Sequence, residues 1–221
     1  CDQHHREKTG GLLPKELVQK ANANPFNLRE GVSKPYNLHF SGNQAEIFIG
    51  GNSFTCEDQG YGTVMVPISI DGVALIGLIL GDGHLLLNVV AFDEFNSPVL
   101  HIKNNQLFYS TSPWDIQLVS TTLTIREAHR KILLELEFSP PNKVIVTRGR
   151  FLRNGIEVLV RPENILITNN ATYISGCHAH NCYGGLILGH HEQQMSGFMA
   201  INGIPRYLGD RSAALLFERE C

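Results

Sequence analysis

The sequence predicts a mainly β fold, either a β-solenoid-like body (a single-stranded right-handed β-helix) or a β-sandwich with hairpins. From Gln44 onward, hydrophobic residues recur with a period of two over several stretches. This period is typical of half-buried strands, because successive side chains of a strand point to opposite faces of a sheet. Asp-Gly and Asn-Gly pairs separate some of these stretches, and the chain contains 21 glycines. Together these observations favour strands joined by tight turns.

The clearest strand pattern lies between Ile132 and Phe138, where hydrophobic residues alternate with Glu135 and Glu137. One face of this strand is therefore expected in a core and the other in solvent. The same alternation occurs at Ile47 and Ile49, Ile68 and Ile70, Leu123 and Ile125, Val144 and Val146, Ile156, Val158 and Val160, and Ile165 and Ile167.

Two dipeptides predict antiparallel hairpins. Asp71-Gly72 and Asn154-Gly155 lie between apolar runs, and both pairs tolerate the positive φ angles of a tight hairpin turn. Pro140-Pro141-Asn142 makes a third break between strands. Gly81-Asp82-Gly83-His84 is predicted to be a turn, because it lacks the lysine and the following helix of a phosphate-binding loop.

A weak internal repeat favours the solenoid alternative. Asn104-Asn105 and Asn169-Asn170 each follow a short apolar strand. This is the rhythm of β-helix coils, in which asparagine amides stack along the solenoid. A pure β-helix does not contain hairpins, so a Greek-key or sandwich body is the alternative fold.

The chain divides into three regions. Residues 1–36 hold polar residues, a short helical segment and a linker. Pro14 is predicted to open the helix, and Asn22, Asn24 and Pro25 to end it. Residues 37–192 form the β-rich body, and residues 193–221 form a C-terminal tail with little periodicity.

Composition excludes several classes of protein. No apolar run approaches the roughly 20 residues of a membrane-spanning helix, and no signal-peptide pattern is present. Five cysteines are an odd and scattered set, which is unlike a secreted disulfide framework. We therefore expect a cytoplasmic protein of bacterial or phage origin, with no membrane partner and a reducing environment. A lipoprotein matured to an N-terminal cysteine is an alternative.

The net charge is −3, so contact with nucleic acid would need a local basic patch. One candidate patch consists of Arg126, Arg130, Lys131, Lys143, Arg148, Arg150, Arg153 and Arg161. Glutamates are interleaved with these residues, and a mixed, solvated surface is the alternative interpretation.

The first nine residues carry a candidate metal site. Cys1 and His4 are separated by two residues, so a tight knuckle can turn both side chains toward one zinc ion. His5 then points elsewhere and is free for a second role. The alternative is an exposed polar terminus that happens to contain two histidines.

This run, Cys1-x-x-His4-His5-x-x-Lys8-Thr9, resembles the closing segment of HNH endonucleases. In that family the segment typically reads Cys-x-x-Cys-His-x-x-Lys-Thr, so His4 replaces a zinc-binding cysteine. The resemblance covers about nine residues. It implies a structural zinc held by Cys1 and His4, and a catalytic divalent metal held in part by His5.

The resemblance also implies metal-dependent hydrolysis of phosphodiester bonds, with DNA as the partner. The family's first cysteine pair, general-base histidine and asparagine would precede Cys1. On this interpretation the chain is the C-terminal portion of an HNH endonuclease-like protein, and alone it is inactive.

A second, weaker cluster contains Cys177, His178, His180 and Cys182, followed by His190 and His191. On an extended strand His178, His180 and Cys182 would share one face, and such N and S ligands suit zinc or another borderline metal. The alternatives are small, buried cysteines in a β-helix coil and a histidine-rich strand on the axis of a homo-oligomer.

Three functional hypotheses follow. The leading one is the β-rich C-terminal region of an HNH-type, metal-dependent nuclease-like protein. The second is a non-enzymatic β-solenoid that binds a partner or assembles with itself. The third is a β-helix protein that binds or cleaves polysaccharide.

Overall fold

The computed structural model describes residues 19, 23, 36–37, 42–60, 62–109, 115–190 and 197–207. The helical segment predicted after Pro14 and the linker that follows it lie outside the described residues, apart from positions 19 and 23. The tail beyond residue 207 also lies outside them. Among the described residues, no helix has the length and apolar character needed to cross a membrane.

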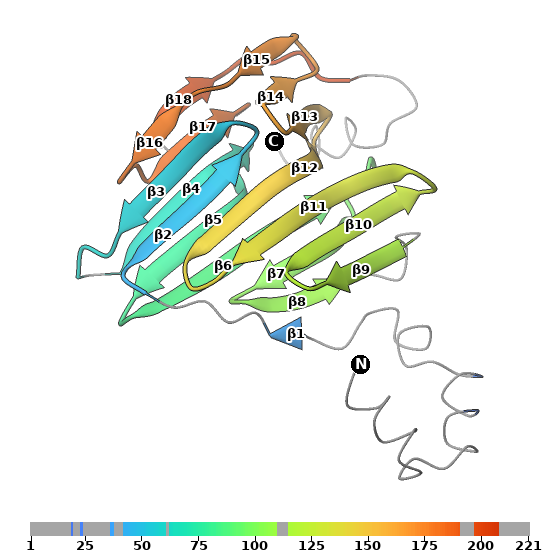
Figure 1. Cartoon of the computed structure of the whole chain (residues 1–221). Helices are drawn as coiled ribbons and strands as arrows, with labels where there is room; N and C mark the ends of the chain where they lie inside the picture. The colour runs from blue at the N-terminus through green and yellow to red at the C-terminus, as the bar shows by residue number, and fades with distance from the viewer. Residues whose placement is uncertain are drawn as a thin grey trace.

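Two open, mixed β-sheets pack face to face, which confirms the prediction of a mainly β body and favours its sandwich version (Figure 1). The eight-stranded sheet has the order β1 (Tyr36–Asn37), β8 (Gln106–Tyr109), β7 (Pro98–Lys103), β6 (His84–Phe92), β5 (Val73–Gly81), β4 (Thr63–Ile70), β17 (Gly184–Leu188) and β18 (Gly197–Ile201). In the ten-stranded sheet the main path is β15 (Thr172–Ile174), β14 (Asn164–Ile167), β13 (Ile156–Arg161), β12 (Lys143–Arg153), β11 (Lys131–Ser139), β10 (Thr122–Ala128) and β9 (Asp115–Val119). A side branch holds β2 (Gln44–Ile49), β3 (Asn52–Glu57) and β16 (His178–His180).

The core lies between the two sheets and is built by the alternation read from the sequence. Leu134, Leu136 and Phe138 of β11 are buried, whereas Glu135 and Glu137 face outward. Each fully buried leucine or phenylalanine stabilises the fold by about 1.5–3 kcal/mol relative to an exposed one.

The predicted hairpin turns are confirmed. Asp71 and Gly72 have φ angles of 49° and 74°, and they join β4 to β5. Asn154 and Gly155 have φ angles of 47° and 74°, and they join β12 to β13. Two consecutive positive φ angles match the right-handed twist of the flanking strands, which is why Asp-Gly and Asn-Gly occur here.

The ten-stranded sheet divides at β12. One edge of β12 pairs with β11 over residues 143–149. The other edge pairs in parallel with β2 over residues 143–146 and antiparallel with β13 over residues 149–153. Gly149 lies where the partner changes. A Cβ added there would lie 3.0 Å from a methyl carbon of Leu134, so the crowding favours glycine.

The paired asparagines cap strands and do not form a solenoid ladder. Asn105 accepts a hydrogen bond from the backbone N–H of Leu87 and donates one to the carbonyl of Leu85. Asn169 accepts from the N–H of Glu157 and donates to the carbonyl of Gly155. The repeat seen in the sequence therefore reflects a shared capping role.

The body extends beyond the boundary expected at residue 192. β18 lies within the region assigned to the tail, and it pairs in parallel with β17. β17 in turn pairs in parallel with β4. β4 and β17 are far apart in the sequence, and β17 and β18 together extend the eight-stranded sheet past the antiparallel hairpins.

Asn52 ties the side branch of the sheet to the chain that leads into β16. Its side chain is fully buried. The amide donates hydrogen bonds to the carbonyls of Ile49, Gly50 and Ile174, and its oxygen accepts one from the N–H of Cys177. One residue thus holds the β2–β3 turn and the approach to β16 in register.

Replacing Asn52 with alanine is expected to lower the free energy of unfolding by about 2–4 kcal/mol, because several buried backbone groups lose their partner. Denaturant titration followed by circular dichroism measures this change. The matched control is Asn170→Ala, since Asn170 is exposed and, among the described residues, its side chain bonds only the nearby N–H of Thr172. Equal, small effects of the two substitutions would contradict the role given to Asn52.

Candidate functional site

Three of the predicted site residues, Cys1, His4 and His5, lie outside the described residues, and so does His191. Their zinc-binding and catalytic roles stay predictions from the sequence. The described part of the chain contains the remaining candidates, His178, His180, Cys182 and His190.

His178 and His180 lie two positions apart on β16, and both are exposed on the outer face of the ten-stranded sheet. Ala179 between them is buried. Each ring is held by a hydroxyl group from the neighbouring strand β3. The Nδ1 atom of His178 is 2.7 Å from Oγ of Ser53, and Nδ1 of His180 is 3.0 Å from Oγ1 of Thr55.

The hydrogen bonds around Asn181 fix the tautomer of His180. The oxygen of the Asn181 amide accepts from the backbone N–H of Glu57 at 2.9 Å, so its nitrogen faces Nε2 of His180 at 3.0 Å. Because an amide NH₂ only donates, Nε2 must be the unprotonated acceptor. The proton of the neutral ring is therefore on Nδ1, which donates to Thr55.

Cys182 does not share the outer face with the two histidines. Asn181 has a φ angle of 52°, which ends β16 and breaks the strand alternation that the sequence prediction assumed. Cys182 instead packs against the core, and it lines a hollow together with Cys56 and Tyr183. Burial raises the pKa of the Cys56 thiol to about 11, so this thiol stays protonated at neutral pH.

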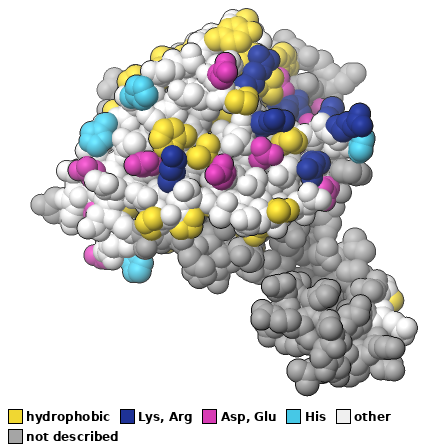
Figure 2. All heavy atoms as spheres, viewed as in Figure 1, with side chains coloured by type: hydrophobic (Ala, Val, Ile, Leu, Met, Phe, Trp, Pro, Cys, Tyr) yellow, Lys and Arg dark blue, Asp and Glu magenta, His cyan; other side chains and the backbone are white. Residues whose placement is uncertain are grey.

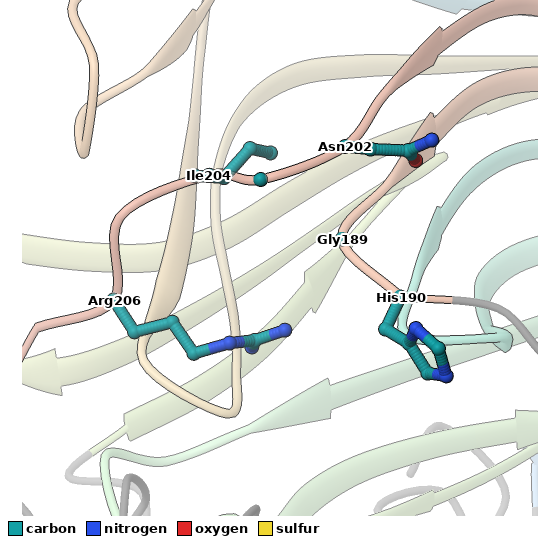
Figure 3. A pocket seen from close by; sticks show the side chains of 6 residues that line it. Gly189, His190, Asn202, Ile204 and Arg206 are labelled. Atoms are coloured by element: carbon teal, nitrogen blue, oxygen red, sulfur yellow. The ribbon is translucent and has the colours of Figure 1, made fainter.

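His190 lies away from β16, at a junction of turns near the end of β17. Its backbone N–H donates to the carboxylate of Asp71 at 2.8 Å. An open hollow of about 360 Å³ is lined by Gly189, His190, Asn202, Ile204 and Arg206. Figure 3 shows how these residues lie around it. Among the described residues, no three His, Cys, Asp or Glu side chains are grouped so that they could hold a metal ion.

Arg206, which lines the hollow, belongs to a buried ion pair that the sequence analysis did not predict. The carboxylate of Asp71, whose side chain is 8% exposed, accepts two hydrogen bonds from the guanidinium of Arg206 at 2.6 and 2.9 Å. Asn154 donates a further bond to it at 2.9 Å. Asp71 and Arg206 are 135 residues apart, and no local pattern in the sequence signals that they meet.

Arg153, one residue of the predicted basic patch, lies over the ring of Phe92 of β6, 4.8 Å from its centroid. The other basic residues predicted to form a patch lie on or beside the outer face of the ten-stranded sheet (Figure 2). Figure 2 shows Lys and Arg side chains there, interleaved with Asp and Glu. Arg126 pairs with Asp115, and Arg150 pairs with Glu157 and Glu127. The exposed residues that form no ion pair with a described residue are Arg130, Lys131, Arg148 and Arg161.

Charge is distributed unevenly along the body. Residues 42–109 contain seven Asp and Glu but one Lys, whereas residues 115–167 contain eight Lys and Arg and six Asp and Glu. The ion pairs above use part of the positive charge of the second stretch. What is left is a modest basic surface over β10 to β13.

Comparison with known proteins gives no relative: no family model, no curated protein and no solved structure matches the chain.

The Asp71–Arg206 pair is expected to be strongly coupled. A double-mutant cycle with Asp71→Asn and Arg206→Gln should give a coupling free energy above about 1.5 kcal/mol, because each partner is largely withdrawn from water. Asparagine tolerates the left-handed backbone at position 71. The matched control is Asp115→Asn with Arg126→Gln, whose side chains are 28% and 25% exposed and should couple by less than about 1 kcal/mol. Equal coupling in the two cycles would contradict the structural role given to the Asp71–Arg206 pair.

Proposed function

We propose that the chain is the β-rich C-terminal region of an HNH-type, metal-dependent nuclease-like protein. The observation that carries this proposal is the run Cys1-x-x-His4-His5-x-x-Lys8-Thr9. Cys1 and His4 contribute to a structural zinc site, and His5 contributes to the site of the catalytic divalent ion. In such a site the metal polarises the phosphodiester and stabilises charge that develops during hydrolysis.

On this proposal the β-sandwich is not catalytic and positions the DNA. Its basic surface over β10 to β13 supports this role, because Arg130, Lys131 and Arg148 are exposed and not engaged in ion pairs with described residues. Such side chains contact phosphates and release bound counterions, which gives affinity without selecting a sequence.

A second candidate is a binding or self-assembly module without enzymatic activity. The observation that favours it is the set of unpaired strand edges in the described sheets, at β1, β9, β15, β16 and β18. An open edge presents free N–H and C=O groups to which another strand can add. The polysaccharide hypothesis depended on the β-helix, and it loses that basis in a sandwich.

The nuclease proposal is tested on the protein that includes the residues encoded immediately before Cys1. We expect a Cys-x-x-Cys pair, a histidine and an asparagine there. The extended protein should nick plasmid DNA with Mg²⁺ or Mn²⁺, and His5→Ala should slow cleavage at least about 100-fold, as expected for loss of a group at a reacting metal. His84→Ala, in the β5–β6 turn, is the control and should cut normally. A lipobox or a start codon directly before Cys1 would overturn the proposal.

DNA binding by the body is tested by fluorescence anisotropy with a duplex of about 20 base pairs, measured between 50 and 200 mM salt. The triple variant Arg130→Glu, Lys131→Glu and Arg148→Glu should weaken binding at least tenfold and reduce the salt dependence of log K by about one unit per lost phosphate contact. Lys103→Glu, on the acidic half of the body, should bind like the unmodified chain. A protein that binds no DNA but forms defined oligomers in light scattering would favour the assembly module instead.

A further inference from the structure

We infer that His178 and His180 form a two-histidine site for a borderline divalent ion, such as Zn²⁺, Ni²⁺ or Cu²⁺, on the outer face of β16. Imidazole nitrogen is a preferred ligand of these ions. The inference does not rest on the nuclease proposal, because it uses none of the N-terminal residues.

Each ring already has its Nδ1 atom held by a hydroxyl group, as metal-binding histidines usually have on the nitrogen that does not bind the ion. In protein metal sites, a histidine that binds through one nitrogen commonly gives the other N–H to a fixed acceptor, which sets the tautomer and the ring plane. In His180 the hydroxyl of Thr55 is this acceptor, and the lone pair of the ring is on Nε2. In His178 the hydroxyl of Ser53 contacts Nδ1 at 2.7 Å and leaves Nε2 without a partner among the described residues.

The spacing of the histidines suits two ligands to one ion. Residues two apart on a strand lie about 7 Å from each other and on the same face. In a tetrahedral site with Zn–N bonds of about 2.0–2.1 Å, the two nitrogens are about 3.3 Å apart. The ring tips must therefore lean together along the strand, while water fills the other coordination positions.

The three strands around this place carry more carboxylates than cationic side chains. Strands β2, β3 and β16 contain two carboxylates, Glu46 and Glu57, and neither Lys nor Arg. Glu46 is the register partner of Thr55, which itself pairs with His180. A negative carboxylate thus lies one strand beyond the hydroxyl that orients the ring, and on its other side Glu46 is the register partner of Lys143 of β12.

Asn181 competes with the ion for His180. Its amide nitrogen donates to the same Nε2 lone pair that a metal would take, so binding requires this side chain to move away. Asn181 has a left-handed backbone, φ 52°, which glycine adopts without strain. Replacing it with glycine therefore frees the ligand atom at little conformational cost.

The test is calorimetric titration of Zn²⁺ into a chain with Cys1→Ser, His4→Ala and His5→Ala, which removes the N-terminal ligands and separates this inference from the nuclease proposal. We expect one ion per chain. His178→Gln, which keeps a polar side chain of similar size, should weaken binding at least tenfold, and Asn181→Gly should tighten it. His84→Ala is the matched exposed control and should bind like the parent.

Ring ¹⁵N chemical shifts supply a second readout. Zn²⁺ should move the Nε2 signals of His178 and His180 and leave their Nδ1 signals as bound N–H groups. Thermal unfolding without metal should be the same for the parent and for His178→Gln. Unchanged affinity in His178→Gln, or ion-induced shifts confined to other histidines, would overturn the inference.

Discussion

The change of partner along β12 is the constraint on which the rest of the ten-stranded sheet depends. Over residues 143–146 this strand pairs with β2, and over residues 149–153 it pairs with β13. The two branches must separate between these segments, and crowding at Gly149 leaves little room for a side chain there. In the strand ladder, β3 and β16 join the sheet through β2 and these four residue pairs, and Asn52 adds a hydrogen bond to the end of β15. The position of His178 and His180 therefore depends on where β12 forks.

Hydrogen bonds between polar side chains hold together turns that strand pairing does not connect. Asp71, Asn96 and Asn154 belong to three different turns and all have positive φ angles. Their side chains bond to one another, and Asn154 is the centre because it bonds both of the others. Arg206 adds the C-terminal segment to this group through its ion pair with Asp71. Residues chosen for turn conformation thus also hold distant parts of the chain together, which a glycine at the same positions would not do.

Local features of the fold were predictable from the sequence, and non-local pairing was not. The alternation in β11 and the turns at Asp71 and Asn154 each depend on a few neighbouring residues, so their patterns are visible in one sequence. By contrast, Ser53 and His178 are 125 residues apart, and nothing local specifies that β3 and β16 run in parallel. Strand periodicity predicted correctly that His178 and His180 share one face. It did not predict that Cys182 lies off this face, because that follows from the left-handed backbone of Asn181.

Two physical explanations compete for the histidines of β16, and the hydrogen bonds separate them. β16 is a short strand at the edge of its sheet, and polar side chains on an edge discourage unwanted strand addition. That role needs only polarity, so it places no demand on the direction of either ring. Yet both rings have Nδ1 fixed by a hydroxyl of β3, and ordering two side chains costs rotamer entropy. Protection of the edge does not explain why both Nδ1 atoms are held, whereas ligation through Nε2 commonly uses a fixed partner on Nδ1.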